Sequence, residues 1–188
     1  DFDGAVRDRE VVSRGYEGLV RYHDGKGDRR RATDLLEKAC RQGGMDYTLP
    51  TALAGRRLAG GDGKGALSVL LEGLRKTPSE PDLVTVSEIS LRAVRGLGTG
   101  RAASAARRDA AALLDDLGAR IARDPVTSHV PCLNLARAEA LLGRETQALD
   151  YLRKAMERGF QGIRDSADDP DFKALTGSRK FRELTTAP

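Results

Sequence analysis

An internal repeat with a period of 34 residues constrains the fold of this chain more than any other feature. The anchors of the first copy are Leu19, Gly27, Ala32 and Leu36, and those of the second are Leu53, Gly61, Ala66 and Leu70. A third copy, with Leu135, Gly143, Ala148 and Leu152, begins 82 residues beyond the second. Because this interval exceeds two periods by 14 residues, we predict one further, enlarged unit in the gap. A fixed period of this size is typical of stacked supersecondary units, so four units are expected.

Each unit has the apolar spacing of two helices separated by a glycine. In the last copy the apolar positions are Leu135, Ala138 and Leu142 before Gly143, and Ala148, Leu152 and Ala155 after it. These positions recur at intervals of three and four residues, which places them along one face of a helix. Asp28 precedes the second helix of the first unit, where a side-chain oxygen caps free backbone N–H groups. The pattern predicts an antiparallel helix hairpin in every unit.

Composition agrees with a helical core. Of the 188 residues, 39% are hydrophobic but only 4% are aromatic, and Trp is absent. A core of this kind is built from Leu, Ala, Val and Ile, which suits closely packed helices better than a sheet rich in aromatic side chains. We therefore predict an all-α fold with units at about 10–45, 47–79, 81–125 and 129–160. Residues 161–188 lie beyond the last unit and are expected to form a helical cap.

The units resemble the tetratricopeptide repeat family. The residues that carry this resemblance are Leu53-Ala54, Ala66-x-x-x-Leu70 and Pro78 in the second unit, and Leu135-Ala136, Gly143 and Ala148-x-x-x-Leu152 in the last. The first unit, with Leu19-x-x-Tyr22, Gly25-x-Gly27 and Glu37-Lys38-Ala39-Cys40-x-x-Gly43, is also similar to the Sel1-like repeat. The sequence departs from the consensus at aromatic sites, which carry Arg57 and Glu139. The resemblance implies a right-handed superhelical α-solenoid whose concave groove is lined by the first helix of each unit.

The two regions outside the clearest repeats have their own patterns. In residues 82–123 a first helix, a turn at Gly96–Gly100 and a long second helix from Ala103 to Arg123 are expected. The glycines of this turn follow a helix rather than a strand, which disfavours a nucleotide-binding loop. The segment around Asp169-Pro170-Asp171-Phe172 resembles the end-of-group segment that follows the last repeat in some bacterial tetratricopeptide proteins. Its apolar residues are expected to cover the exposed face of the last unit: Ile163, Phe172, Leu175, Phe181 and Leu184.

Few residues of the chain stand in a pattern typical of a catalytic or metal site. His23 and His129 stand apart without the neighbouring ligands that zinc requires, and His23 occupies a site that the family fills with an aromatic residue. Cys40 and Cys132 lie on different units and are interpreted as packed thiols. The Gly60–Gly65 segment lacks the spacing of a phosphate-binding P-loop and is expected to form a turn. Helix capping explains the Asp168, Asp169 and Asp171 cluster better than a cation site does. We expect no enzyme activity, no cofactor and no metal site.

Charge does not single out a nucleic-acid partner. The chain carries 32 Lys and Arg against 28 Asp and Glu, a formal charge of +4, with the signs mixed along the sequence. The third unit is locally basic, and its arginines could attract anions: Arg92, Arg95, Arg101, Arg107, Arg108, Arg120 and Arg123. No aromatic residues alternate with them for base stacking, which disfavours nucleic acid.

The resemblance to the repeat family assigns the groove residues. The matching inward positions are Arg14, Glu17, Arg21, Thr51, Gly55, Leu58, Leu133, Arg137 and Leu141. They lack the Lys and Asn of the carboxylate clamp that holds C-terminal peptides in the best-known version of this groove. The expected function is therefore a non-catalytic scaffold or adaptor that binds a protein partner, as a peptide or a helix, through Arg21, Arg137 and apolar patches.

Several alternatives stay open at the sequence level. Similar arrays are often attached to bacterial kinases, cyclases or thioredoxin-like domains, so a regulatory or sensory region of a larger protein is the main alternative. An anionic-ligand or nucleic-acid binder is the weaker one. No segment approaches the roughly 18 apolar residues of a membrane span, so no membrane insertion is expected. Both a cytoplasmic location and, if a signal is removed upstream of Asp1, a periplasmic one are compatible with the sequence, and the oligomeric state is open.

Overall fold

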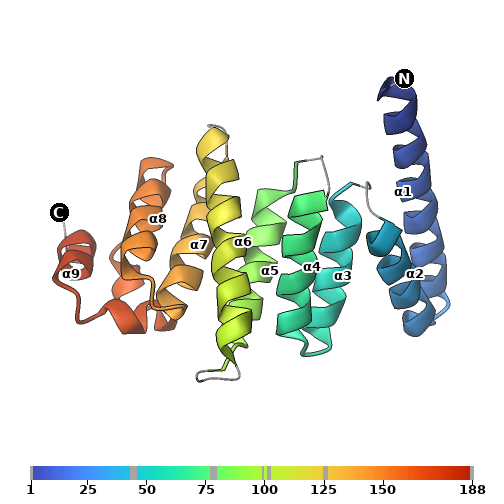
Figure 1. The fold of residues 1–188 in the computed structure, drawn as a ribbon. Helices are drawn as coiled ribbons and strands as arrows, with labels where there is room; N and C mark the ends of the chain where they lie inside the picture. Colours follow the sequence, from blue (N-terminus) through green and yellow to red (C-terminus); the bar gives the residue numbers. More distant parts are fainter. Residues whose placement is uncertain are drawn as a thin grey trace. The chain divides into compact units, whose positions relative to one another are not determined.

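The described part of the protein is entirely helical (Figure 1). The computed structural model describes residues 2–42, 46–76, 80–98, 100, 103–124 and 127–186, with side chains from residue 11 onward. No strand occurs within these ranges. The helices of the predicted units are α1 (Phe2–Gly25), α2 (Arg29–Gln42), α3 (Thr48–Ala59), α4 (Gly63–Lys76), α5 (Leu83–Arg95), α6 (Ser104–Arg123), α7 (His129–Leu141) and α8 (Glu145–Glu157). The all-α prediction is confirmed.

The chain forms two compact units, Asp1–Asp82 and Leu83–Pro188. In the first, α1 packs on α2, α2 on α3 and α3 on α4. Its core is made largely of the aliphatic anchors that the repeat predicts, including Leu36, Leu53, Ala66 and Leu70, all of which are buried. Tyr47 is buried with them and donates a hydrogen bond of 2.8 Å from its hydroxyl to the Leu70 carbonyl. This bond satisfies the polar end of an aromatic residue inside an aliphatic core.

In the second unit α7 is the central helix. It packs against α5, α6 and α8 and against η3 (Pro170–Leu175). Consistent with this position, most residues of α7 are buried, among them Cys132, Leu135 and Ala136. Asn134 is buried as well, and its amide donates a hydrogen bond of 3.1 Å to the Ser87 hydroxyl of α5. A helix enclosed on so many sides loses the polar stripe that a surface helix shows.

The repeated glycines form the hairpin turns. Gly27, Gly61 and Gly143 have φ angles of 76°, 81° and 74°, in the left-handed region that glycine adopts without a Cβ clash. The following aspartates cap the second helices of the first two hairpins: Asp28 Oδ1 accepts a hydrogen bond from Arg31 N, and Asp62 Oδ1 accepts one from Gly65 N. Gly60 and Gly61 therefore lie in a helix–helix turn, as the sequence predicts, whereas Gly63–Gly65, also expected in this turn, form the start of α4.

The enlarged third hairpin owes its size to α6, which has 20 residues. Its buried side is Leu113, Leu114, Leu117 and Ile121. The glycine-rich turn before it follows the helix α5, as expected, although Thr99, Arg101 and Ala102 lie outside the described residues.

The C-terminal segment folds as three short helices: η2 (Asp165–Ala167), η3 and α9 (Arg179–Thr186). Phe172 and Phe181 are fully buried and their ring centroids lie 5.6 Å apart. Leu175 is buried with them, whereas Ile163 and Leu184 are half-buried. Both phenylalanines are therefore core residues of this segment, in which η3 packs on α7 and α9 packs on η2.

Candidate functional site

Three of the predicted groove residues lie on α1. Arg14 and Arg21 are exposed and Glu17 is half-buried. Their spacing of three and four residues places them on one face of the helix. Arg21 Nη2 lies 3.6 Å from Glu17 Oε2, a loose surface ion pair that holds neither side chain firmly. This face therefore presents the positive charges of Arg14 and Arg21 to solvent.

Three more predicted residues lie on α3 of the same unit. Thr51, Gly55 and Leu58 are all half-buried and share one helix face. The Thr51 hydroxyl donates a hydrogen bond of 2.7 Å to the Tyr47 carbonyl, so its hydrogen is used within α3. No atom lies within 4 Å of the position that a Cβ on Gly55 would take, which leaves open space there. The α3 face thus offers a shallow surface of small and apolar groups.

The remaining predicted residues lie on α7, in the second unit, and are less accessible. Leu133 is buried and Leu141 is half-buried. Arg137 is bound by the C-terminal segment of the chain itself: its Nε and Nη2 each lie 2.8 Å from Asp169 Oδ2. Arg137 is predicted from the sequence to lie on a partner-binding surface, but in the structure its guanidinium is paired with Asp169 of the same chain.

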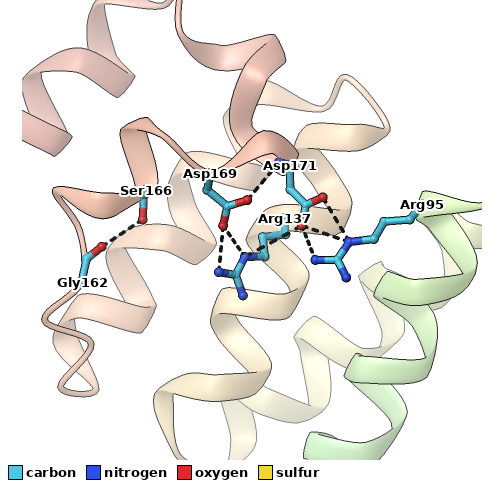
Figure 2. Close-up of polar contacts among 6 residues, drawn as sticks. All are labelled: Arg95, Arg137, Gly162, Ser166, Asp169 and Asp171. Carbon is cyan, nitrogen blue, oxygen red and sulfur yellow. Dashed lines mark hydrogen bonds and ion pairs between the residues drawn. The ribbon is translucent and has the colours of Figure 1, made fainter.

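Figure 2 shows that two arginines and two aspartates form one cluster. Arg95 of α5 reaches Asp171 with its Nε 3.1 Å from Oδ1 and its Nη2 2.6 Å from Oδ2. Asp169 Oδ1 accepts a hydrogen bond of 2.9 Å from Asp171 N, which caps η3. The expectation that the aspartates cap a short helix holds for Asp169. The same residues also tie η3 to α5 and α7, a role that the sequence reasoning missed.

The two arginines and two aspartates of the cluster balance one another in charge. The hydrogen bonds that Arg95 donates to Asp171 raise the pKa of the Arg95 guanidinium above its ordinary value, an effect that partial burial opposes. Charge-assisted bidentate bonds of this type are among the stronger polar interactions in proteins. Beside the cluster, the Ser166 hydroxyl donates a hydrogen bond of 3.3 Å to the Gly162 carbonyl, which closes the turn before η3 (Figure 2). The arrangement is structural, because it attaches the C-terminal segment to α5 and α7.

Glu139 is a fully buried carboxylate on α7. Its burial raises its pKa to about 7, although Arg144 partly offsets the effect. Arg144 Nε lies 3.2 Å from Glu139 Oε2, but neither carboxylate oxygen accepts a hydrogen bond from a described residue. The ion pair is therefore a Coulombic contact without hydrogen-bond geometry. The sequence carries a signal for this burial, because Glu139 stands at a site that the repeat family fills with an aromatic residue.

Both cysteines are free thiols. Cys132 is fully buried, and Cys40 is half-buried, so it is less enclosed than the sequence predicts. Burial raises the pKa of the Cys40 thiol to about 11 and also raises that of Cys132. A nucleophilic cysteine needs a lowered pKa, so these two thiols stay protonated at neutral pH.

Many arginines of the third hairpin form hydrogen bonds or ion pairs within the compact unit Leu83–Pro188. Arg107 Nη2 donates a hydrogen bond of 3.0 Å to the Leu141 carbonyl, and Arg123 Nε donates one of 3.3 Å to the Ala119 carbonyl. Arg120 and Arg92 form ion pairs with acidic residues one turn earlier in their own helices. Arg101 lies outside the described residues. Most of the described arginines that the sequence suggests as an anion-attracting surface thus have partners within the compact unit Leu83–Pro188, and Arg108 is exposed.

The structure also exposes a surface that the sequence reasoning missed. Six large apolar side chains are exposed in the described part of the chain, and four of them lie on α1: Val11, Val12, Leu19 and Tyr22. Leu19 is a repeat anchor and was expected in the core. Its counterparts Leu53 and Leu135 are buried, whereas Leu19 is 49% exposed. The signal that could have found this surface is the clustering of apolar residues at helical spacing beside Gly15 and Gly18.

Within the described ranges, no group of three or more His, Cys, Asp or Glu side chains is placed to hold a metal ion. In the same ranges no helix has the length and apolarity to cross a bilayer. Many of the charged side chains described above bind neighbouring helices, whereas α1 carries four of the six large apolar side chains that are exposed in the described part of the chain, together with the exposed Arg14 and Arg21. Comparison with protein-family models, curated proteins and solved structures found no match to this chain.

Proposed function

We propose that this chain is a non-catalytic protein-interaction module that binds a peptide or a helix of another protein. In this proposal its hairpins stack as a right-handed α-solenoid like that of tetratricopeptide repeat proteins. The contact residues lie on α1 and α3, the first helices of the two hairpins in the compact unit Asp1–Asp82: Arg14, Glu17, Arg21, Thr51, Gly55 and Leu58.

The observation that carries the proposal is the concentration of exposed apolar side chains on α1. Val11 is 70% exposed and Tyr22 is 60% exposed, on the same helix as the exposed Arg14 and Arg21. Scattered surface apolar residues need no explanation, but a contiguous apolar patch with a charged rim is typical of an interaction site. The protonated state of both thiols supports a binding role rather than nucleophilic catalysis.

The second unit has a different role in this proposal. Its first-helix surface at α7 is covered by η3, and Arg137 is bound to Asp169. A partner would have to displace a segment whose Phe172 and Phe181 are fully buried. We therefore assign partner binding to the first unit and assign Arg137, Leu133 and Leu141 to the internal packing of the second.

The test is a comparison of partner recovery by the full chain and by a charge-reversal variant. Arg14→Glu combined with Arg21→Glu reverses the charge of the proposed surface at two exposed positions. Arg30→Glu combined with Arg31→Glu makes the same change in net charge on α2, where both residues are also exposed. Each purified chain is immobilised, exposed to an extract of cells that produce the protein, and the bound proteins are quantified by mass spectrometry.

The proposal predicts at least one protein that the wild type and the α2 variant retain and the α1 variant loses. Folding of all three chains is checked by circular dichroism, because surface substitutions usually change stability by less than about 0.5 kcal/mol. Equal recovery of every bound protein by the three chains would contradict the assignment to α1.

A further inference from the structure

The exposed face of α1 has the geometry of a helix-packing seam. Val11, Gly15, Gly18 and Tyr22 follow one another at intervals of four, three and four residues, the spacing of the a and d positions in packed helices. Val12 and Leu19 flank the seam and are 46% and 49% exposed. Ser13 and Val20, on the opposite face, are buried. The helix thus uses one face for the core of its own unit and presents a second apolar face to solvent.

The centre of this seam is open. A Cβ added at Gly15 or at Gly18 would meet no atom within 4 Å. Between Val11 and Tyr22 the backbone of α1 is therefore bare, and a second helix can approach more closely than side chains normally allow. A bulky apolar side chain of that helix would fill the trough over the two glycines.

The charge beside the seam selects the kind of helix that fits. Arg14 and Arg21 lie on one flank, seven residues apart, and both are exposed. Arg14 forms no ion pair with a described side chain, and Arg21 has only the loose contact with Glu17. Near the other end of the seam, Lys26 Nζ lies 5.8 Å from the centroid of the Tyr22 ring. Acidic side chains on a partner helix would complement this rim.

A second copy of the same chain fits the seam poorly. In an antiparallel pair of α1 helices, Val11 faces Tyr22 and Gly15 faces Gly18 of the second copy, so the sizes match. The same register places Arg14 opposite Arg21 of the second copy, on the flank where side chains of two helices meet. Like charges at that position repel. The antiparallel arrangement of two copies is therefore disfavoured, and the two arginines are better matched by a different helix that carries acidic flanks.

We propose that the seam of α1, from Val11 to Tyr22, docks an amphipathic helix of another protein that has bulky apolar residues along one face and Glu or Asp beside them. One apolar side chain of this helix occupies the trough over Gly15 and Gly18, and its acidic residues pair with Arg14 and Arg21. The inference rests on the proposed function and names the class of partner and the face of α1 that it uses.

The experiment measures binding of synthetic helical peptides to the full chain by fluorescence anisotropy. The probe has about three heptads with Leu at a and d and Glu at the flanking e and g positions. The matched peptide has Lys in place of every Glu. We expect the Glu peptide to bind the wild type at least about tenfold more tightly than the Lys peptide. Arg14→Glu combined with Arg21→Glu should reverse this preference, and the Arg30→Glu plus Arg31→Glu control should keep it.

The variant Gly15→Gln with Gly18→Gln tests the trough. Both positions face open space and Gln is a better helix former than Gly, so α1 stays folded while the trough is filled. We expect this variant to bind the Glu peptide at least about tenfold more weakly than the wild type does. Unchanged binding by this variant, or equal binding of the two peptides by the wild type, would overturn the inference.

Self-association is measured in parallel by sedimentation equilibrium. A wild-type dimer that the Gly15→Gln plus Gly18→Gln variant cannot form would also overturn the inference, because the occupant would then be a second copy. The cell-extract experiment separates this failure from failure of the proposed function. If an extract protein is retained through Arg14 and Arg21 but the Glu peptide does not bind, the inference of an acidic helix as partner is wrong, whereas the proposal of an interaction module is still supported.

Discussion

Single residues in this protein have effects that their side-chain type alone would not suggest, and Glu139 is the clearest case. Its pKa of about 7 in the folded protein lies above the ordinary value of 4.5 because the carboxylate is buried. The folded state therefore keeps this proton to higher pH than the unfolded state does. The contribution of Glu139 to the free energy of unfolding is fully present below pH 4.5 and is lost as the pH rises to about 7. The pKa difference between the folded and unfolded states, about 2.5 units, corresponds to about 3 kcal/mol.

Glu139→Gln should remove this loss, because the amide has no proton to release. We expect the variant to match the wild type at pH 5 and to have a free energy of unfolding higher by about 2–3 kcal/mol at pH 8. Urea unfolding at the two pH values measures the difference. Glu88→Gln, at an exposed position, is the control and should change neither value appreciably. A constant difference in the free energy of unfolding between Glu139→Gln and the wild type across this pH range would contradict a buried Glu139 carboxyl group that stays protonated up to about pH 7.

Two helical glycines make a second prediction at the residue scale. A Cβ at Gly73 would lie 2.8 Å from Pro50 Cβ and 3.1 Å from Tyr47 Cε2, although the repeat places Ala39 and Ala155 at the equivalent positions. A Cβ at Gly55 would meet nothing within 4 Å. Gly55→Ala should therefore stabilise the protein by about 0.5–1 kcal/mol through helix propensity. Gly73→Ala should destabilise it by about 1 kcal/mol, since crowding against a rigid proline ring outweighs that gain.

Thermal or urea unfolding of the two variants at the same pH checks these opposite signs. If Gly73→Ala were as stabilising as Gly55→Ala, the close approach of α3 and α4 at Pro50 would be wrong.

At the scale of elements, the turns and hairpins could be predicted from the sequence, but the packing of η3 on α7 could not. Gly27, Gly61 and Gly143 are fixed by local backbone geometry, so a repeat in the sequence reveals them. Arg137 and Asp169 are 32 residues apart and meet only because η3 lies on α7. Local periodicity carries no signal for such a pair. For this reason the sequence reasoning identified Arg137 as available for a partner.

The exposure of Leu19 has a similar cause. Its spacing is that of a core residue, and its counterpart Leu53 is buried. Burial depends on whether another helix covers the same face, and periodicity within one helix does not report that. The sequence therefore predicted that α1 is amphipathic but not that its second apolar face is open.

A double-mutant cycle tests the attachment of the C-terminal segment. Arg137→Ala and Asp169→Ala should each destabilise the protein, and the double variant should lose less than the sum of the two. We expect a coupling free energy of about 1 kcal/mol, because the pair is partly buried but still reaches solvent. The exposed pair Arg153 and Asp150 should give about 0.3 kcal/mol in the same experiment. Additive effects of Arg137→Ala and Asp169→Ala would show that the ion pair does not hold η3.

At the scale of the whole molecule, the formal charge of +4 gives little reason to expect nucleic-acid binding. Arg95, Arg107, Arg120 and Arg123 of the third hairpin have partners within their own unit. We expect no binding of duplex DNA tighter than the nonspecific range of about 10⁻⁴–10⁻⁶ M at physiological salt. Fluorescence anisotropy with labelled DNA at increasing salt checks this. Tighter binding that weakens steeply with salt would instead support the anion-binding alternative.

The division of roles between the two units is the central claim of this account. The most direct measurement is hydrogen–deuterium exchange of the full chain, alone and saturated with the extract protein that depends on Arg14 and Arg21. We predict that binding slows amide exchange within residues 11–22 of α1 and leaves α7 and the segment 165–186 unchanged. Slower exchange confined to α7, with faster exchange in 165–186, would show that the partner displaces the C-terminal segment and would contradict the claim.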